Sequence, residues 1–172
     1  ELASLIGDAQ VRNRGTIGGS VSNSDPAADY PAGVLGLGAE IVTNKRSIAA
    51  DDFFTAMFET ALEEGELLTK IKFPKPEAAA YVKFPNPASR YATVGVFIAQ
   101  TGSGVRVAIT GAAPSVFRST DMEAALNGEF SVEALEGITL DAGEMNSDLH
   151  ATAEYRAHLC TVMAKRAVRK LL

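Results

Sequence analysis

The sequence has 172 residues, of which 47% are hydrophobic and 22% are charged. This is the balance of a folded globular chain, and it excludes a disordered or fibrous protein. Twenty-one acidic residues against 16 basic ones give a net charge of −5, which repels a phosphate backbone, so we expect no nucleic-acid partner. Cys160 is the only cysteine, which excludes an intrachain disulfide and a multi-cysteine zinc or iron–sulfur site.

The same features indicate where such a chain works. A single cysteine is typical of a reducing compartment, and we expect a cytoplasmic location. No run of about 18 apolar residues occurs, and residues 1–8 lack the basic-then-apolar order of a signal peptide, so no membrane-spanning segment is expected. The chain starts without methionine and its most unusual segment follows almost at once. We therefore expect it to be part of a longer protein.

The first predicted elements are short. Val11–Ser24 is rich in glycine, asparagine and serine, which favour turns, and predicts an ordered loop. In Asp25–Leu37, Pro26 suits the first turn of a short buried helix that Asp25 would cap. Next, Ala39–Thr43 and Arg46–Ala49 flank a two-residue loop and predict a hairpin.

The next elements lead to a domain boundary. Asp51–Phe58 predicts a short helical or irregular segment. Leu67–Phe73 alternates as a strand does, and Pro74 and Pro76 would end it. We place the boundary between two domains here, giving residues 1–75 and 76–172.

The second domain reads as strands followed by helices. Three apolar segments predict an antiparallel meander: Ala80–Phe84, Tyr91–Gln100 and Val105–Ala112. Thr120 and Glu123 have the spacing of a capping box and would open a helix that Gly128 ends. From Asp148 onward, apolar residues recur near a 3.6-residue period and predict a long C-terminal helix. This order favours the α+β class.

The segment from Arg12 to Ser20 is the strongest candidate for ligand binding. Gly18 and Gly19 remove two side chains from one stretch of backbone, so that its N–H groups can approach a ligand oxygen, as anion-binding nests require. Thr16 and Ser20 add hydroxyl groups. A tight turn whose glycines serve only the backbone conformation has the same spacing, and the spacing does not choose between the two.

Other chemistry-bearing residues favour structural roles. His158 and Cys160 lie two apart on a predicted helix and point to different sides, which suits neither metal binding nor an activated thiolate. His150 reads as an exposed histidine, and the acidic run of residues 59–66 as a solvated face. The basic C-terminal residues complement the dipole of the last helix. We therefore expect no catalytic residue and no metal site.

A resemblance to a known family extends over most of the chain. The segment VRNRGTIGGSVSNSDPAADYP closely resembles the second flavin-binding motif of the medium, FAD-carrying subunit of the molybdenum hydroxylases, a family that includes aerobic carbon monoxide dehydrogenase and the flavin part of xanthine dehydrogenase. Weaker matches follow in the family's order over nearly the whole chain: Asp52-Phe53-Phe54, Gly65–Leu68, Ile71–Pro74, Tyr81–Phe84, Gly111–Pro114, Tyr155-Arg156-Ala157 and Lys165-Arg166-Ala167.

The resemblance implies a fold and a set of cofactor contacts. Residues 1–75 would be the second FAD-binding subdomain of the PCMH-type fold, with a mixed sheet and short helices, and residues 76–172 a C-terminal domain of antiparallel sheet plus helices. The family's first glycine-rich loop would precede Glu1. The residues implied to bind FAD are Thr16, Ile17, Gly18, Gly19, Ser20, Asp25, Asp29, Leu68 and Lys83. Ser89 and Arg90 stand where some members place acidic residues, and they stay unassigned.

The resemblance also implies a function. The chain would be part of a flavoprotein subunit whose FAD receives electrons from [2Fe–2S] clusters on a small subunit and passes them to an acceptor. Molybdopterin would sit on a large subunit, and this chain alone would be inactive. Two alternatives remain open: a flavin-free module for subunit docking, and a hydrolase with an unrecognised acidic pair.

Overall fold

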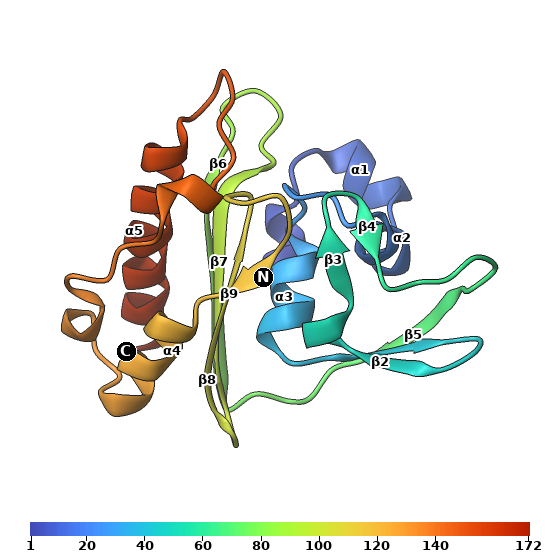
Figure 1. Ribbon diagram of the computed structural model, residues 1–172, viewed down its shortest axis with the longest axis horizontal. Coiled ribbons are helices and arrows are strands. Elements are labelled where there is room, and N and C mark those ends of the chain that lie inside the picture. Colours follow the sequence, from blue (N-terminus) through green and yellow to red (C-terminus); the bar gives the residue numbers. More distant parts are fainter.

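The structure is a computed structural model that describes residues 1–172, and its centre is a four-stranded antiparallel sheet in the order β6-β7-β8-β9 (Figure 1). Helices α4 and α5 cover one face of this sheet, and α3 packs against the other (Figure 1). The α+β class and the predicted meander are confirmed. These elements are β6 (Ala78–Pro85), β7 (Ala92–Thr101), β8 (Gly104–Thr110), β9 (Phe117–Arg118), α3 (Tyr30–Gly36), α4 (Thr120–Gly128) and α5 (Ala153–Leu171).

Strand β7 is buried on both faces. Every side chain from Val94 to Ala99 is apolar, and Gly95 within this run has no side chain. Val96 and Ile98 belong to the core under α4 and α5. Phe97 and Ala99 belong to a second core, which α3 and the first part of the chain complete. The central sheet therefore has a hydrophobic core on each of its two faces.

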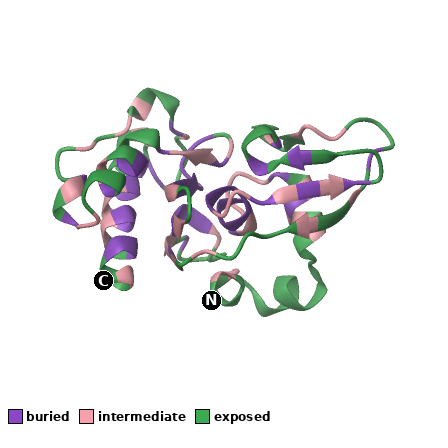
Figure 2. Ribbon diagram, turned by 90° about the horizontal axis from the view of Figure 1, so that it is seen from below, coloured by how far each residue is buried: buried purple, intermediate pink, exposed green.

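Helix α5 buries a stripe of side chains against the sheet (Figure 2), among them Leu159, Met163 and Val168. Thr152 caps its first turn by accepting a hydrogen bond from the Tyr155 amide. Cys160 lies in this stripe, and burial raises the pKa of its thiol to about 12. The prediction that Cys160 is a core residue is confirmed.

The first part of the chain contains two small sheets. Their strands are β1 (Glu40–Thr43), β2 (Ser47–Ala49) and β5 (Leu68–Lys72), in the order β2-β1-β5, and β3 (Phe54–Ala56) with β4 (Glu59–Thr60). The hairpin around residues 44 and 45 is confirmed. Every pairing is antiparallel, so the sheet that was expected to be mixed is antiparallel throughout.

The loop predicted over Val11–Ser24 is wrong, because two short helices occupy it: α1 (Ala9–Arg14) and α2 (Ile17–Asn23). The Asp8 carboxylate caps α1 by accepting from the amides of Gln10 and Val11 at 2.6 and 2.9 Å. The Thr16 hydroxyl caps α2 by accepting from the Gly19 amide at 3.0 Å. Side-chain caps of this kind offset the low helix propensity of glycine.

Two predicted caps are also wrong. Asp25 does not open α3, which begins at Tyr30; its carboxylate instead accepts from the Ala27 amide at 2.9 Å in a local turn. Glu123 does not close a capping box on α4. Its carboxylate accepts from the Val107 amide of β8 at 2.9 Å and from the Arg118 guanidinium at 2.6 and 2.8 Å. The Glu123 carboxylate therefore makes tertiary hydrogen bonds instead of capping its own helix.

The acidic run contains one buried carboxylate. Glu59, Glu63 and Glu64 are exposed, as expected of a solvated face, but Glu66 is buried. Its carboxylate accepts from Arg46 at 3.1 Å, from the Glu63 amide at 2.9 Å and from the Thr43 hydroxyl at 2.7 Å. These bonds, led by Arg46, lower the pKa of Glu66 to about 2. Glu66 therefore fastens the β4–β5 turn to the hairpin.

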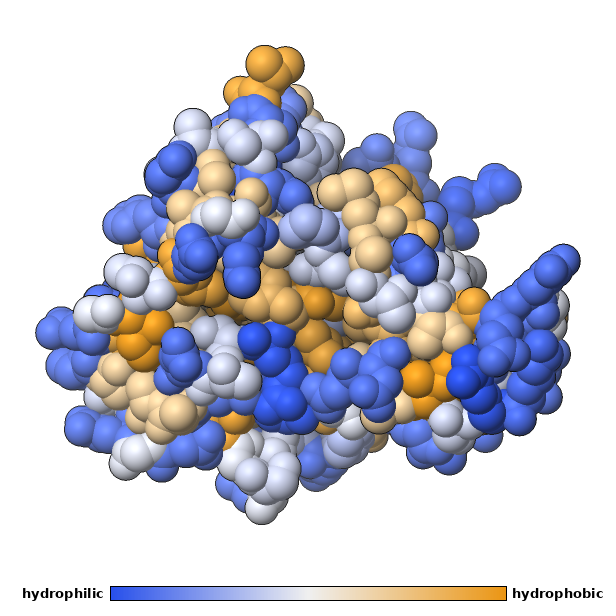
Figure 3. All heavy atoms as spheres, viewed as in Figure 1, coloured by the Kyte–Doolittle hydropathy of each residue, from blue (hydrophilic) through white to orange (hydrophobic).

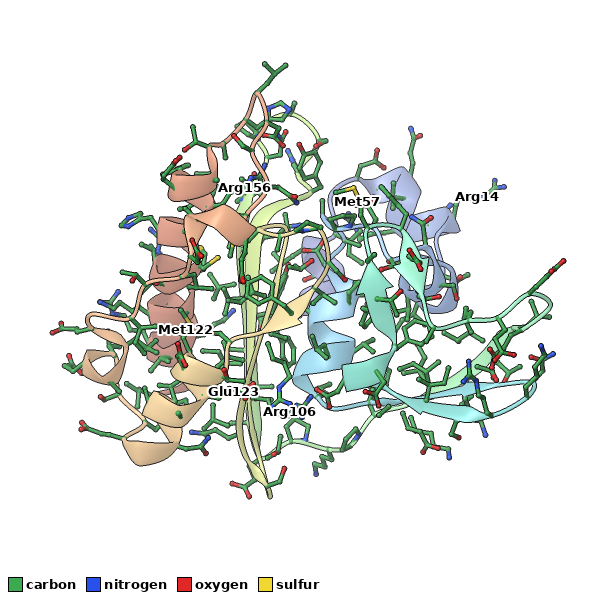
Figure 4. The ribbon with its side chains drawn as sticks, viewed as in Figure 1. Arg14, Met57, Arg106, Met122, Glu123 and Arg156 are labelled. Atoms are coloured by element: carbon green, nitrogen blue, oxygen red, sulfur yellow. The ribbon has the colours of Figure 1, made fainter.

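An ion-pair network joins the two parts of the chain, and its Arg106 is labelled in Figure 4. Asp51 follows the hairpin and pairs with Arg106 of β8 at 2.8 Å and with Arg118 of β9 at 3.0 Å. Arg106 also donates to the Leu35 carbonyl near the end of α3 at 2.8 Å. On the face drawn in Figure 3, apolar atoms gather in the middle of the molecule; the arm at the right is mainly hydrophilic, and the tip at the top is hydrophobic. No helix is long and apolar enough to span a membrane.

The close approach of α3 to the sheet gives a stability prediction. A Cβ on Gly36 would lie 2.5 Å from the Phe97 ring, so Gly36→Ala must push the helix off the sheet. We expect it to lower the free energy of unfolding by about 2 kcal/mol, the usual cost of overpacking. Urea unfolding followed by fluorescence and by circular dichroism measures this, and both probes should report one transition, because the second core spans both parts.

Gly128→Ala is the matched control, since nothing lies within 4 Å of its added Cβ, and it should leave the midpoint unchanged or raise it. Equal midpoints for Gly36→Ala and the unmodified chain would show that α3 does not approach the sheet so closely.

Candidate cofactor site

The glycines of the sequence motif form the first turn of α2. Because Thr16 caps the Gly19 amide and the Ser20 amide bonds to the Thr16 carbonyl at 3.0 Å, the amides of Ile17 and Gly18 precede the first intrahelical hydrogen bond. A Cβ on Gly18 would meet only the Leu68 side chain, at 3.6 Å. The turn thus presents backbone without side-chain cover, as a cofactor phosphate or ring edge requires.

A cavity of about 640 Å³ adjoins α2 and the segment that follows it. Ser20, Asp25 and Asp29 line it, together with residues that reach it from the second part of the chain. The glycine motif predicted neither these residues of the second part nor Phe58 of the β3–β4 turn. Those additional lining residues are Phe58, Ser89, Tyr91, Asn146, Asp148 and Arg156.

The segment Asp25–Asp29 is held against the ends of the central strands. The Ala92 amide donates to the Ala27 carbonyl at 3.2 Å, and the Gly111 amide donates to the Pro26 carbonyl at 2.7 Å. Gly111 has a φ of +83°, and a Cβ there would lie 2.4 Å from the Ala92 carbonyl oxygen. Only glycine fits this junction, which explains the Gly-Ala-Ala-Pro signal in the sequence.

Asp29 is the centre of a buried polar cluster. Its carboxylate accepts from the Tyr81 hydroxyl at 2.5 Å and from the Lys83 ammonium at 3.0 Å. The side chains of Lys83 and Asp29 are 5% and 4% exposed. Gly95 makes the cluster possible, because a Cβ there would lie 2.2 Å from the Tyr81 oxygen.

The cluster has a defined electrostatic balance. Burial raises the pKa of Asp29, while the hydrogen bond from Tyr81 and the charge of Lys83 oppose the shift. Burial and the neighbouring carboxylate raise the pKa of Tyr81 well above its usual value. An unpaired charge would be costly here, so the pair Asp29–Lys83 neutralises the wall of the cavity.

The structure brings most of the predicted site residues together around α2. Thr16, Ile17, Gly18, Gly19 and Ser20 form its cap and first turn, with Leu68 against Gly18. Lys83 faces a second cavity of about 470 Å³, which Arg12 and Arg90 also line. Leu67, beside Leu68, is 66% exposed, and strand alternation points it away from the core that Leu68 joins.

Comparison with known proteins decides the family. Residues 1–76 match the family described as the FAD binding domain in molybdopterin dehydrogenase, and residues 79–171 match the CO dehydrogenase flavoprotein C-terminal domain. The chain belongs to the medium, FAD-binding subunits of the molybdenum hydroxylases. It is 34% identical to the carbon monoxide dehydrogenase medium chain of Hydrogenophaga pseudoflava, over 98% of this chain and 64% of that protein.

One further relative and a solved structure agree. The nicotine 6-hydroxylase medium subunit of Paenarthrobacter nicotinovorans is 34% identical over 95% of this chain and 62% of its own length. The structure of the Hydrogenophaga pseudoflava carbon monoxide dehydrogenase that lacks the Mo-pyranopterin moiety of its cofactor superposes with a TM-score of 0.82, covering 96% of this chain and 63% of that one. This medium-subunit chain thus spans somewhat less than two thirds of these relatives.

The residues present fit FAD. The first turn of α2 has room for a phosphate oxygen where a Cβ would otherwise lie, and the hydroxyl of Ser20 lines the adjoining cavity. The carboxylates nearest to α2 are already engaged, Asp25 by the Ala27 amide and Asp29 by Lys83. The ion pair therefore neutralises Asp29, whereas Asp25 keeps its charge and is held by a backbone hydrogen bond.

The buried pair gives a pH-dependent prediction. Lys83→Met removes the cation beside Asp29 and should lower the free energy of unfolding at neutral pH by about 3 kcal/mol, because a buried carboxylate loses its partner. The pKa of Asp29, already raised, should rise further, since Lys83 is one of the groups that hold it down. The unfolded carboxyl ionises near pH 4. Stability should therefore fall as the pH increases from about 4 through the folded pKa.

Urea unfolding between pH 4 and pH 8 checks this. Lys72→Met is the control, since it breaks the exposed Lys72–Glu40 pair at 3.0 Å and should cost less than about 1 kcal/mol. A pH-independent loss in Lys83→Met, or a loss no larger than in Lys72→Met, would contradict the assignment.

Proposed function

We propose that this chain holds FAD within a molybdenum hydroxylase, where the flavin receives electrons from the [2Fe–2S] clusters of a partner subunit and passes them to an acceptor. The observation that carries the proposal is the first turn of α2 in a chain of the FAD-binding family: Gly18 and Gly19 leave its backbone without side-chain cover, and a cavity of about 640 Å³ meets the same helix at Ser20 and Asn23. When bound, FAD supplies the one- and two-electron chemistry that protein side chains lack.

Each site residue then has a role in binding. The backbone of Ile17, Gly18 and Gly19 lies along the cofactor, and Thr16 and Ser20 contribute hydroxyl groups, although Thr16 also caps α2. Leu68 supports the turn from β5 by packing on Gly18.

The carboxylates and Lys83 have a different task. Asp25 and Asp29 fix the segment that forms the cavity wall, and Lys83 keeps Asp29 paired. Because Asp29 neutralises the charge of Lys83, the pair acts on the cofactor by fixing the cavity wall rather than as a free cation beside the ring. No side chain of this chain needs to act as an acid or base in bond cleavage.

The partners and location follow from the same proposal. The chain has one cysteine, buried in the core under α5, so the iron–sulfur ligands must come from a small subunit and molybdopterin from a large one. The absence of a second cysteine also fits a cytoplasmic location.

We propose a domain division near residue 76, with the second FAD-binding subdomain before it and the C-terminal domain after it. Somewhat more than a third of each relative's length lies outside the match to this chain, and we propose that a first subdomain supplies the opposite wall of the FAD site. In that arrangement the 172 residues provide half of the phosphate contacts.

Titration with FAD tests the proposal. Alone, the 172-residue chain should bind FAD weakly or not at all, because half of the donors are missing and the ring stays exposed to water. With the first subdomain present, the protein should purify with the visible absorption of oxidised flavin, near one FAD per chain. A colourless protein with the first subdomain present would favour a docking module. Stoichiometric FAD on the short chain would show that the division of the site is wrong.

A substitution in α2 tests the glycine turn. Gly18→Val places a branched side chain on the backbone that should lie along FAD, and we expect FAD affinity to fall by at least about tenfold. The fold should survive, because the added Cβ meets only Leu68, at 3.6 Å. Isothermal titration with the apoprotein, including the first subdomain, measures the affinity.

Ser89→Ala is the control. Ser89 lines the cavity of about 640 Å³, but its hydroxyl donates to the Asn86 side chain at 3.3 Å, so the affinity for FAD should change less than twofold. Equal affinities for the two variants would count against the glycine turn as a cofactor contact.

A further inference from the structure

Arg156 is a buried cation outside the proposed FAD contacts. It lies in the first turn of α5 and is 3% exposed. Figure 4 shows it between α5 and the strand ends at the top of the sheet. Its guanidinium donates to the carbonyls of Thr93 and Gly111 at 2.7 and 2.8 Å, and to the Asp148 carboxylate at 2.7 Å.

These three acceptors lie on three different segments, and two of them, Gly111 and Asp148, line the cavity. Thr93 is at the start of β7, next to Ala92, whose amide holds the Ala27 carbonyl. Gly111 follows β8, and its own amide holds the Pro26 carbonyl at 2.7 Å. The guanidinium therefore bonds to Gly111 and to Thr93, the neighbour of Ala92. The backbone amides of Gly111 and Ala92 are the two that fix the segment Asp25–Asp29.

Asp148 extends the arrangement to the loop before α5. One of its carboxylate oxygens accepts from the amides of His150 and Ala151 at 2.8 and 3.0 Å, and the other accepts from Arg156. The backbone N–H of Asn146, in the same loop, donates to the Ala112 carbonyl at 2.8 Å. Residues of this loop line the cavity opposite the Asp25–Asp29 segment.

We propose that Arg156 is a positioning residue of the cofactor cavity: it ties β7, the turn after β8 and the Asp148 loop together and thereby fixes the Asp25–Asp29 wall. Its effect on FAD rests on the function proposed above. The role needs arginine, because a planar guanidinium reaches three acceptors in different directions, whereas a lysine ammonium is a single point charge.

Hydrogen exchange read by NMR on the full chain tests the positioning directly. In Arg156→Gln, the amides of Ala92 and Gly111 should exchange at least tenfold faster, because the strand ends that carry these amides are no longer held by the guanidinium. The Val107 amide, bonded to Glu123 in the same sheet, should be unchanged. Arg156→Lys should recover part of the protection.

Two further variants separate positioning from general stability. Asp148→Asn changes a side chain that is 44% exposed, so the fold should persist while the amides of Ala92 and Gly111 exchange severalfold faster. Arg166→Gln, on the exposed side of the same helix, should change nothing. Unchanged exchange at Ala92 and Gly111 in Arg156→Gln and Asp148→Asn would overturn the proposal, as would equal acceleration at Val107.

The effect on the cofactor is measured in the assembled enzyme, freed of FAD and titrated back. Arg156→Gln should lower FAD affinity about tenfold and change the visible circular dichroism of bound flavin, with Arg166→Gln as control. Local loss of protection with unchanged affinity and dichroism would overturn the link to the cofactor. If the unmodified enzyme bound no FAD, the proposed function would fail, while the exchange data would still decide whether Arg156 positions the cavity wall.

Discussion

The structure depends on strand β7 being buried on both faces. A strand with one polar face would have allowed either α3 or the pair α4 and α5 to pack, but not both. Because Val96 and Ile98 face one core and Phe97 and Ala99 the other, the first part of the chain is attached to the second through apolar contact, and the ion pairs of Asp51 lie around that contact. The cavity arises at one end of this shared sheet, where the segment after α2 meets the strand ends.

The sequence predicted what local patterns determine. The antiparallel meander follows from long runs of branched apolar residues, and the end of β5 follows from Pro74 and Pro76. The glycine motif marked the candidate site, because Gly18 and Gly19 leave the backbone at the start of α2 without side-chain cover. Its conformation was missed, since the caps from Asp8 and Thr16 form helices where composition indicates a loop. A cap depends on one or two specific hydrogen bonds, and the amino-acid composition of a segment does not predict them.

Tertiary partners account for the other differences. The local sequence predicts a capping box for Glu123 and a solvated face for Glu66. In the structure, each carboxylate accepts hydrogen bonds from an arginine and from a backbone amide. Lys83 was expected beside the flavin ring, but the expectation included no partner for it. Its carboxylate partner is 54 residues away, and the contacts of Arg156 with Thr93 span 63 residues. Pairings at such separations depend on the folded sheet, and one sequence does not reveal them.

The charges around the cavity explain how an acidic chain can accept an anionic cofactor. The carboxylates of Asp25, Asp29 and Asp148 all line it, and unpaired they would repel a pyrophosphate and oppose negative charge on a reduced flavin. Asp29 is paired with Lys83 and Asp148 with Arg156, while Asp25 accepts a backbone amide. Asp8 also lines the cavity and accepts two backbone amides in the cap of α1. The ion pairs neutralise Asp29 and Asp148, while Asp8 and Asp25 keep their charge and hold local turns of the backbone. The field left at the first turn of α2 comes mainly from backbone N–H groups, which favours an anion without adding a mobile charge.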